Sequence, residues 1–261
     1  PQGILATALG TVLLPVLSDF AAQRKHDEMR GAIHHGLRTL LFVMTPAAIG
    51  LFVLAPAIVQ MLFEHGSFDP KSTVLTARAL SFYAPGLMVF CLAKVFVPAF
   101  YALQDTRTPV KVGLCAVTLN LTLNIVSTLT LPEEWKHAGM AFSTVISEGF
   151  NGLVLAALLR RRLGRFGIRG ILAGLGRALG AAAAMAATAF YAERALTTWL
   201  YVYLPHKAAQ LVGVPLAIAL GMAVYFGAAR LFRFPELGFV GDALRSRKQK
   251  KTGNAAPAEQ P

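Results

Sequence analysis

Six long apolar stretches constrain the fold of this chain more than any other feature of its sequence. They cover residues 39–63, 80–103, 112–131, 138–159, 171–192 and 208–229. Each is close to the roughly 20 apolar residues that a helix needs to cross a bilayer core. Because lipid offers no partner for backbone N–H and C=O groups, a segment in it must bond to itself as a helix. The sequence therefore predicts an all-α, polytopic membrane helix bundle with six transmembrane helices.

Two segments fit this pattern less well. The first apolar run, residues 4–17, is short and is followed by Ser18, and Pro15 lies near its end. We interpret it as the last part of a truncated helix, in a chain whose start indicates the middle of a longer protein. The fifth stretch is interrupted by Arg177, which leaves 15 uncharged residues from Ala178 onward. It is the weakest of the six predicted spans.

The basic residues predict which ends of the spans face the cytoplasm. If the spans alternate in direction, the loops fall into two sets, one with 19 Lys and Arg and the other with five. Cytoplasmic loops carry the excess of basic residues. The richer set includes residues 24–38, 107–111, 160–177 and the C-terminal tail, so we expect a multi-pass membrane protein with a cytoplasmic C-terminus. The net charge of +12 then reflects topology and does not indicate a nucleic-acid partner.

Lys94 is the one basic residue deep inside a predicted span. Pro98, four residues later, has no N–H to bond to the Lys94 carbonyl, so we predict a kink at the charge. A broken helix beside an ionisable group is a common design of transporter sites. The alternative is a lysine that extends to the interface and anchors the helix. We favour a functional role for Lys94.

Polar side chains also occur in the third and fourth full spans. Glu148 follows Ser147 and lies one turn before Asn151. It could belong to a coupling-ion or proton site, or be a protonated carboxyl bonded to a neighbouring helix, which we favour. Asn120 and Asn124 lie on one helix face and could line a pathway or hold helices together, and we favour the second role.

The remaining candidates favour packing and solvation over chemistry. Glycines 170, 174, 176 and 180 form two small-xxx-small pairs that allow close helix approach. We interpret His26, His34 and His35 as solvated loop residues, because their spacing fits no tight metal-ligand set. The chain has no phosphate-cradling loop, catalytic triad or paired-carboxylate site. We therefore expect no catalytic residues, no metal and no cofactor, and a protein that is not an enzyme.

Three motifs together resemble a known family. They are Ala8-Leu-Gly-Thr-Val-Leu-Leu-Pro15, the run Leu62-Phe-Glu-His-Gly-Ser-Phe68 and the run Pro98-Ala-Phe-Tyr-Ala-Leu-Gln-Asp-Thr-Arg-Thr-Pro-Val110. In order and spacing they are similar to the C-terminal half of the bacterial lipid II flippases. These form the MurJ or MviN family of the multidrug/oligosaccharidyl-lipid/polysaccharide exporter superfamily. The third motif is the most specific, and the resemblance runs from residue 1 to about residue 233.

The resemblance implies a fourteen-span protein with two six-helix lobes around a central cavity and two further helices that form a groove for a lipid tail. On that pattern, residues 1–165 are the end of span eight and spans nine to twelve, residues 166–233 are the groove helices, and residues 234–261 are a basic, partly disordered cytoplasmic tail. Lys94, Asp105, Arg107 and Lys111 would gate the inward mouth or meet the substrate pyrophosphate. The first lobe, with its cationic substrate-binding residues, is absent.

The function implied is movement of the undecaprenyl-pyrophosphate-linked peptidoglycan precursor, lipid II, across the inner membrane by alternating access. The expected partners are lipid II, membrane lipids and the missing N-terminal lobe of the same protein. Two transport alternatives stay open: an exporter of another polyprenyl-linked glycan, and a drug/cation antiporter, for which Glu148 is the one suitable in-membrane acid. A non-transporting membrane scaffold is a further alternative, and it predicts that neutralising Lys94 has no effect.

Overall fold

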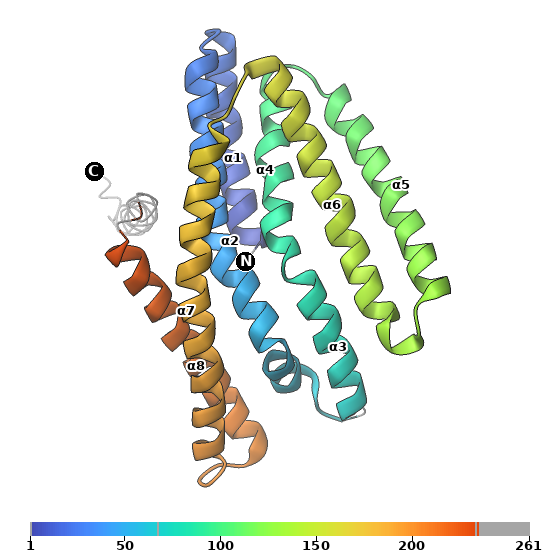
Figure 1. Ribbon diagram of the computed structural model, residues 1–261, viewed down its shortest axis with the longest axis vertical. Coiled ribbons are helices and arrows are strands. Elements are labelled where there is room, and N and C mark those ends of the chain that lie inside the picture. Colours follow the sequence, from blue (N-terminus) through green and yellow to red (C-terminus); the bar gives the residue numbers. More distant parts are fainter. Residues whose placement is uncertain (1, 67, 233, 235–261) are drawn as a thin grey trace, which may run out of the picture.

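The computed structural model describes residues 2–66, 68–232 and 234, and over these residues the chain is entirely α-helical (Figure 1). Its eight helices are α1 (Gln2–Ala22), α2 (His26–Phe63), α3 (Pro70–Tyr83), α4 (Gly86–Ala102), α5 (Arg107–Thr130), α6 (Glu133–Leu163), α7 (Ile168–Leu200) and α8 (His206–Leu231). Five of them are long and apolar enough to cross a membrane, and α3 with α4 gives a sixth span if the bent pair is counted as one. The predicted all-α membrane bundle is confirmed. The predicted tail, residues 235–261, lies outside the described residues.

The helices extend beyond the apolar stretches that predicted them. α1 continues through Pro15 and Ser18 to Ala22, so the expected end of this helix at Leu17 is wrong. α2 begins at His26, well before the first apolar stretch, and α7 runs through Arg177 without a break. Charged residues at helix ends remain helical while their side chains reach water, so apolar runs locate spans better than they locate helix ends.

The second predicted span contains a break between α3 and α4. α3 and α4 meet at an angle of 43° across Ala84 and Pro85. α4 then stays helical through Lys94 and Pro98, so the helix is not interrupted at the charge, and the kink predicted there stays a prediction. The buried side chains of Val95 and Phe100 pack α4 into the main core, and this packing holds the helix together across the missing hydrogen bond.

Two clusters of buried apolar side chains organise the bundle. The larger one joins α1, α2, α4 and α6 and includes Leu17, Ile33 and Leu155. The smaller one joins α2 to the α7–α8 hairpin through Phe42, Met185 and other side chains. Figure 1 shows the hairpin at one edge of the bundle and α5 at the opposite edge, beside α6. α5 exposes large apolar side chains such as Leu114, Val117 and Leu121, as expected for a helix in contact with lipid, and its exposed threonines bond to the helix's own carbonyls.

Two prolines in α2 create acceptors that neighbouring helices use. Pro46 has no N–H for the carbonyl of Phe42, and the Tyr225 hydroxyl of α8 donates to that oxygen at 2.6 Å. Pro56 likewise leaves the Phe52 carbonyl, which accepts from the Ser81 hydroxyl of α3 at 3.4 Å. Helix-breaking residues are tolerated in membranes where neighbours satisfy the freed groups. The prolines of α2 therefore select where α3 and α8 dock.

The bond from Tyr225 predicts a specific effect on stability. Replacing Tyr225 with Phe keeps the buried ring and removes the donor, so the Phe42 carbonyl is left unsatisfied inside the protein. We expect a loss of about 1–3 kcal/mol in unfolding free energy. The exposed Tyr203 provides the matched control, and Tyr203→Phe should leave stability unchanged. Equal unfolding curves in detergent for the two variants would contradict a role for this bond.

Candidate functional site

An apolar groove lies between α2 and the α7–α8 hairpin. Its cavity volume is about 480 Å³, and its lining includes Pro46, Gly50 and Leu54 of α2, Met185 of α7 and Met222 of α8. Such a volume lies within the range of small-molecule sites. Apart from the Tyr225 hydroxyl, which is bonded to α2, the side chains that line the groove are apolar. The groove can therefore accept a hydrocarbon chain and offers little to a polar ligand.

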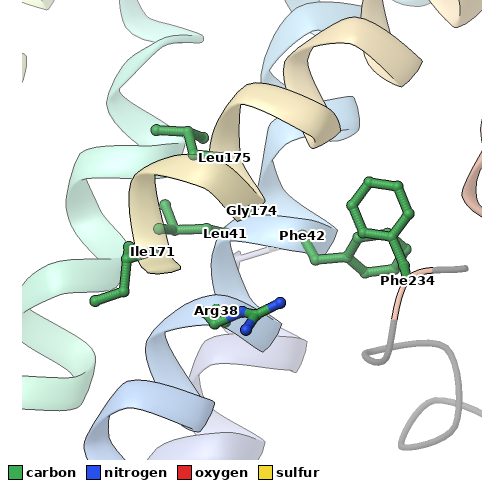
Figure 2. Close-up of a pocket in the computed structure, with 7 residues that line it drawn as sticks. All are labelled: Arg38, Leu41, Phe42, Ile171, Gly174, Leu175 and Phe234. Atoms are coloured by element: carbon green, nitrogen blue, oxygen red, sulfur yellow. The ribbon is translucent and has the colours of Figure 1, made fainter. Parts of the chain in front are cut away.

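One end of the groove is closed by aromatic rings. Phe42 lies 5.3 Å from Tyr225 and 5.1 Å from Phe234, measured between ring centroids. Beyond Phe42 lies a small pocket of about 10 Å³, which is lined by Arg38, Phe42, Gly174, Phe234 and three aliphatic side chains (Figure 2). The groove thus changes from apolar to cationic within one helical turn of α2.

The two predicted glycine pairs of α7 behave differently. A Cβ on Gly170 would lie 3.2 Å from the His34 ring, and one on Gly174 would lie 3.5 Å from Arg38 Nε. These two glycines make room for polar side chains of α2, as predicted for close approach. Gly176 and Gly180 have no neighbour within 4 Å among the described atoms, so their predicted role is wrong. A spacing of four identifies a face of the helix but does not reveal whether another helix covers it.

The three histidines lie in α2 rather than in a loop, so that part of the interpretation is wrong, while His26 and His35 are exposed to solvent as expected. The His34 side chain is half-buried, and its Nδ1 lies 2.8 Å from the Phe166 carbonyl in the turn between α6 and α7. Phe166 itself is buried against Phe96 of α4. Together these contacts fix the start of the α7–α8 hairpin to the main bundle. No group of His, Cys, Asp or Glu suited to a metal occurs among the described residues.

Asp105 joins three elements at the turn between α4 and α5. Its carboxylate accepts from the Thr108 backbone N–H at 2.9 Å and hydroxyl at 2.7 Å, and it pairs with Arg162 at the end of α6 at 2.5 Å. The bonds from Thr108, and after them the Arg162 charge, hold the pKa of Asp105 below its ordinary value. Arg162 could not be singled out from the sequence, because it lies in a run of three arginines without a distinguishing local pattern.

This arrangement predicts a dependence on pH. A carboxylate with a lowered pKa adds stability above its unfolded pKa of about 3.9. That contribution is lost as the pH falls through the still lower folded value. We expect the contribution of the Asp105–Arg162 pair to be constant from pH 5 to 8 and to disappear in stronger acid. Asp105→Asn keeps one acceptor for Thr108 but removes the charge that pairs with Arg162, so its difference from wild type in thermal unfolding should shrink as the Asp105 carboxylate becomes protonated in acid. A difference that persists there would contradict this assignment.

The other predicted cations of the site are exposed. Lys94 lies in the middle of α4, and Arg107 and Lys111 lie in the first turns of α5. None of the three forms a hydrogen bond or ion pair with a described residue. The structure therefore brings Asp105 together with Arg162, while the three cations stay available to an anion from outside the described chain.

The amides of α5 face α6. Asn120 Nδ2 donates to Ser147 Oγ at 3.1 Å, and Asn124 Nδ2 donates to Asn120 Oδ1 at 3.0 Å. Ser127 and Ser143 hydroxyls meet further along at 3.3 Å. These bonds hold α5 against α6, the role we favoured for the two asparagines. Hydroxyl and amide oxygens are also ligands of hard cations, so the same side chains remain candidates for an ion-binding site.

Glu148 has a weaker setting than expected. Its Oε2 accepts from Asn151 Nδ2 at 3.4 Å, a contact within α6. Among the described residues Glu148 has no hydrogen bond to another helix, so the favoured interpretation of a carboxyl bonded to a neighbouring helix is wrong. Asn151 Oδ1 and Asn124 Oδ1 are buried without a described hydrogen-bond partner. The polar seam between α5 and α6 is therefore only partly satisfied.

Comparison with known proteins adds the family to this geometry. A family model described as "Lipid II flippase MurJ" matches residues 1–209. The chain belongs to this family. It is 36% identical over 233 residues to a probable lipid II flippase MurJ of Rhizobium meliloti (strain 1021). The aligned region covers 88% of this chain and 42% of the relative. A probable lipid II flippase MurJ of Vibrio cholerae serotype O1 is 32% identical over 229 residues. This alignment covers 86% of this chain and 42% of the relative.

A solved structure supports the fold. The chain resembles "Lipid II flippase MurJ, inward closed conformation" with a TM-score of 0.63 and 23% sequence identity, over 89% of this chain and 44% of that chain. The MurJ fold of the described helices is thus confirmed. The chain spans less than half the length of the MurJ proteins it matches. The family is one of flippases, so membership indicates transport rather than catalysis.

Proposed function

We propose that this chain is part of a flippase that moves lipid II, the undecaprenyl-pyrophosphate-linked peptidoglycan precursor, across the bacterial inner membrane. The apolar groove between α2 and the α7–α8 hairpin carries the proposal, because a long prenyl chain needs such a surface. The substrate diphosphate needs cations, and Lys94, Arg107 and Lys111 are exposed without a described partner. Family membership supports the same substrate.

The division of labour within the chain follows from its packing. We infer that residues 1–165 form a transporter lobe and that residues 166–233 form the groove helices. The turn at residues 164–167 supports this boundary, since Gly164 and Gly167 both have positive φ and α7 packs on α2 beyond them. Alternating access requires one bundle to move against another around a shared site. We therefore infer that a further lobe, present in relatives of more than twice this length, completes the transporter.

A depletion experiment tests the function. Cells lacking their own flippase would receive the full-length protein, this chain alone, or this chain with the remaining part expressed separately. We expect lipid II at the outer leaflet from the first and third but not from the second. Restored growth without lipid II translocation would favour an exporter of another polyprenyl-linked glycan. Activity from the chain alone would contradict the need for a second lobe.

The orientation of the chain can be tested by cysteine labelling. From the excess of basic residues we expect residues 64–71 and 132–137 to face the periplasm and residues 160–169 and the C-terminus to face the cytoplasm. Cys115 is exposed and Cys91 is buried, so both should first be replaced by Ala. An impermeant maleimide should then label cysteines at positions 66 and 134 in intact cells, and position 165 only after lysis. Labelling of position 165 in intact cells would reverse the orientation.

A further inference from the structure

The side chain of Tyr101, near the end of α4, forms no hydrogen bond or ring contact with any described residue. It is also exposed. The other five tyrosines of the chain, which all lie among the described residues, each contact another ring. These contacts join Tyr83 to Phe90, Tyr191 to Phe190, Tyr201 to His206, Tyr203 to Trp199 and Tyr225 to Phe42. Tyr101 therefore presents an aromatic face and a hydroxyl that the described fold does not use.

Lys94 lies on the same face of α4 as Tyr101. The two residues are seven positions apart, which is about two helical turns and about 10 Å along the helix axis. Both side chains are exposed, and neither pairs with a described residue. One face of α4 thus presents an ammonium group and, two turns further along, a free aromatic ring.

The charge of Lys94 indicates what this face contacts. A lysine in the middle of a span is costly against lipid, so the face that carries it meets water or an anion. Tyr101 lies on the same face and shares its surroundings. α5, by contrast, exposes large apolar side chains that suit lipid. The Tyr101 ring therefore faces the aqueous side of α4 rather than acyl chains.

We propose that Tyr101 binds the glycan part of the transported lipid, beside a pyrophosphate held by Lys94. The inference rests on the proposed function and assigns recognition of a sugar ring to one residue. A pyranose ring carries C–H groups that pack on the electron-rich face of an aromatic ring, and its hydroxyls can bond to the tyrosine hydroxyl. In a prenyl-pyrophosphate-linked glycan the first sugar is bonded directly to the pyrophosphate. A cation and an aromatic ring on one helix face therefore match two neighbouring parts of such a molecule.

Specificity for the loaded carrier follows from this pair of residues. Lys94 meets the charge of the pyrophosphate, so it contributes to the binding of any prenyl pyrophosphate. Tyr101 adds affinity only where a sugar follows the pyrophosphate. The pair would thereby select the glycan-bearing lipid over the bare carrier lipid, which has the same prenyl chain and the same charged group.

Binding of two ligands to the full-length protein in detergent, measured by native mass spectrometry, tests the proposal. The probes are lipid II and undecaprenyl pyrophosphate, which has the same prenyl chain and pyrophosphate but no glycan. We expect Tyr101→Leu to weaken lipid II binding by about threefold to tenfold and to leave undecaprenyl pyrophosphate binding unchanged. Tyr101→Phe keeps the aromatic face and should retain most of the affinity for lipid II. Lys94→Ala should weaken the binding of both ligands.

Tyr191→Leu provides the matched control, because it removes another exposed tyrosine, from α7, and should change neither affinity. Equal weakening of both ligands by Tyr101→Leu, or unchanged binding of lipid II, would overturn the proposal. Equal affinity of the wild-type protein for the two ligands would overturn it as well. Tyr101 would then be an aromatic anchor of α4 at the membrane interface. Failure of the wild-type protein to bind lipid II would instead contradict the proposed function itself, and this inference with it.

Discussion

Lys94→Ala in the full-length protein is expected to abolish complementation of flippase depletion while protein levels stay normal. Lys94 lies eight residues from each end of α4, or about 12 Å at the helical rise, and its side chain is exposed. A charge at that depth is costly unless it meets water or an anion. An anionic cargo passing this face would supply the missing partner. Lys94→Arg keeps the charge with another geometry and should retain part of the activity.

The controls for Lys94 separate charge from folding. Lys71→Ala removes an exposed lysine at the start of α3 and should leave growth unchanged. Because the Lys94 side chain has no described partner, its removal should not alter thermal unfolding. Full growth with Lys94→Ala would show that the lysine only anchors α4, as the interfacial interpretation and the scaffold alternative both require.

The position of Lys94 shows what the sequence could and could not predict. Its depth in a span follows from hydropathy, which depends on nearby residues alone. The helix continues past Pro98, because the response of a helix to a proline depends on the helices packed around it. In α2, the carbonyls freed by Pro46 and Pro56 accept hydrogen bonds from the hydroxyls of Tyr225 and Ser81, which are remote in sequence. Local rules predict which carbonyl is freed, but the partner depends on tertiary packing.

The site residues show the same division. The motif around Asp105 predicted a charged turn, and the structure adds Arg162, 57 positions away, as its ion-pair partner. His34 was predicted to be a solvated loop residue, but it lies half-buried in α2, with its Nδ1 2.8 Å from the Phe166 carbonyl in the turn before α7. The groove could be expected from the family resemblance alone. Its lining comes from three helices, and no single apolar run distinguishes a groove from a lipid-facing surface.

Glycine substitutions should produce the largest change in stability. Gly152 is buried in α6, and a Cβ there would lie 2.6 Å from Leu92 Cβ of α4. A Cβ atom is fixed by its backbone, so the two helices must move apart to accept even a methyl group. We expect Gly152→Ala to lower the unfolding free energy by about 1–3 kcal/mol, and Gly152→Leu to prevent accumulation of the folded protein. Thermal unfolding of the purified variants and their yields in membranes measure both effects.

Gly176 provides the matched comparison, because the same substitution should act in the opposite direction there. It lies on the exposed face of α7, and no described atom lies within 4 Å of a Cβ placed there. Gly176→Ala therefore lowers the backbone entropy of the unfolded chain without a clash in the folded protein. We expect a gain of about 0.5–1 kcal/mol. The sequence singled out Gly176, which belongs to a small-xxx-small pair, but not Gly152. Whether a Gly→Ala change stabilises or destabilises the protein therefore depends on whether another helix faces the glycine, which the local sequence does not show. Destabilisation by Gly176→Ala would indicate that another helix covers this face in the complete transporter.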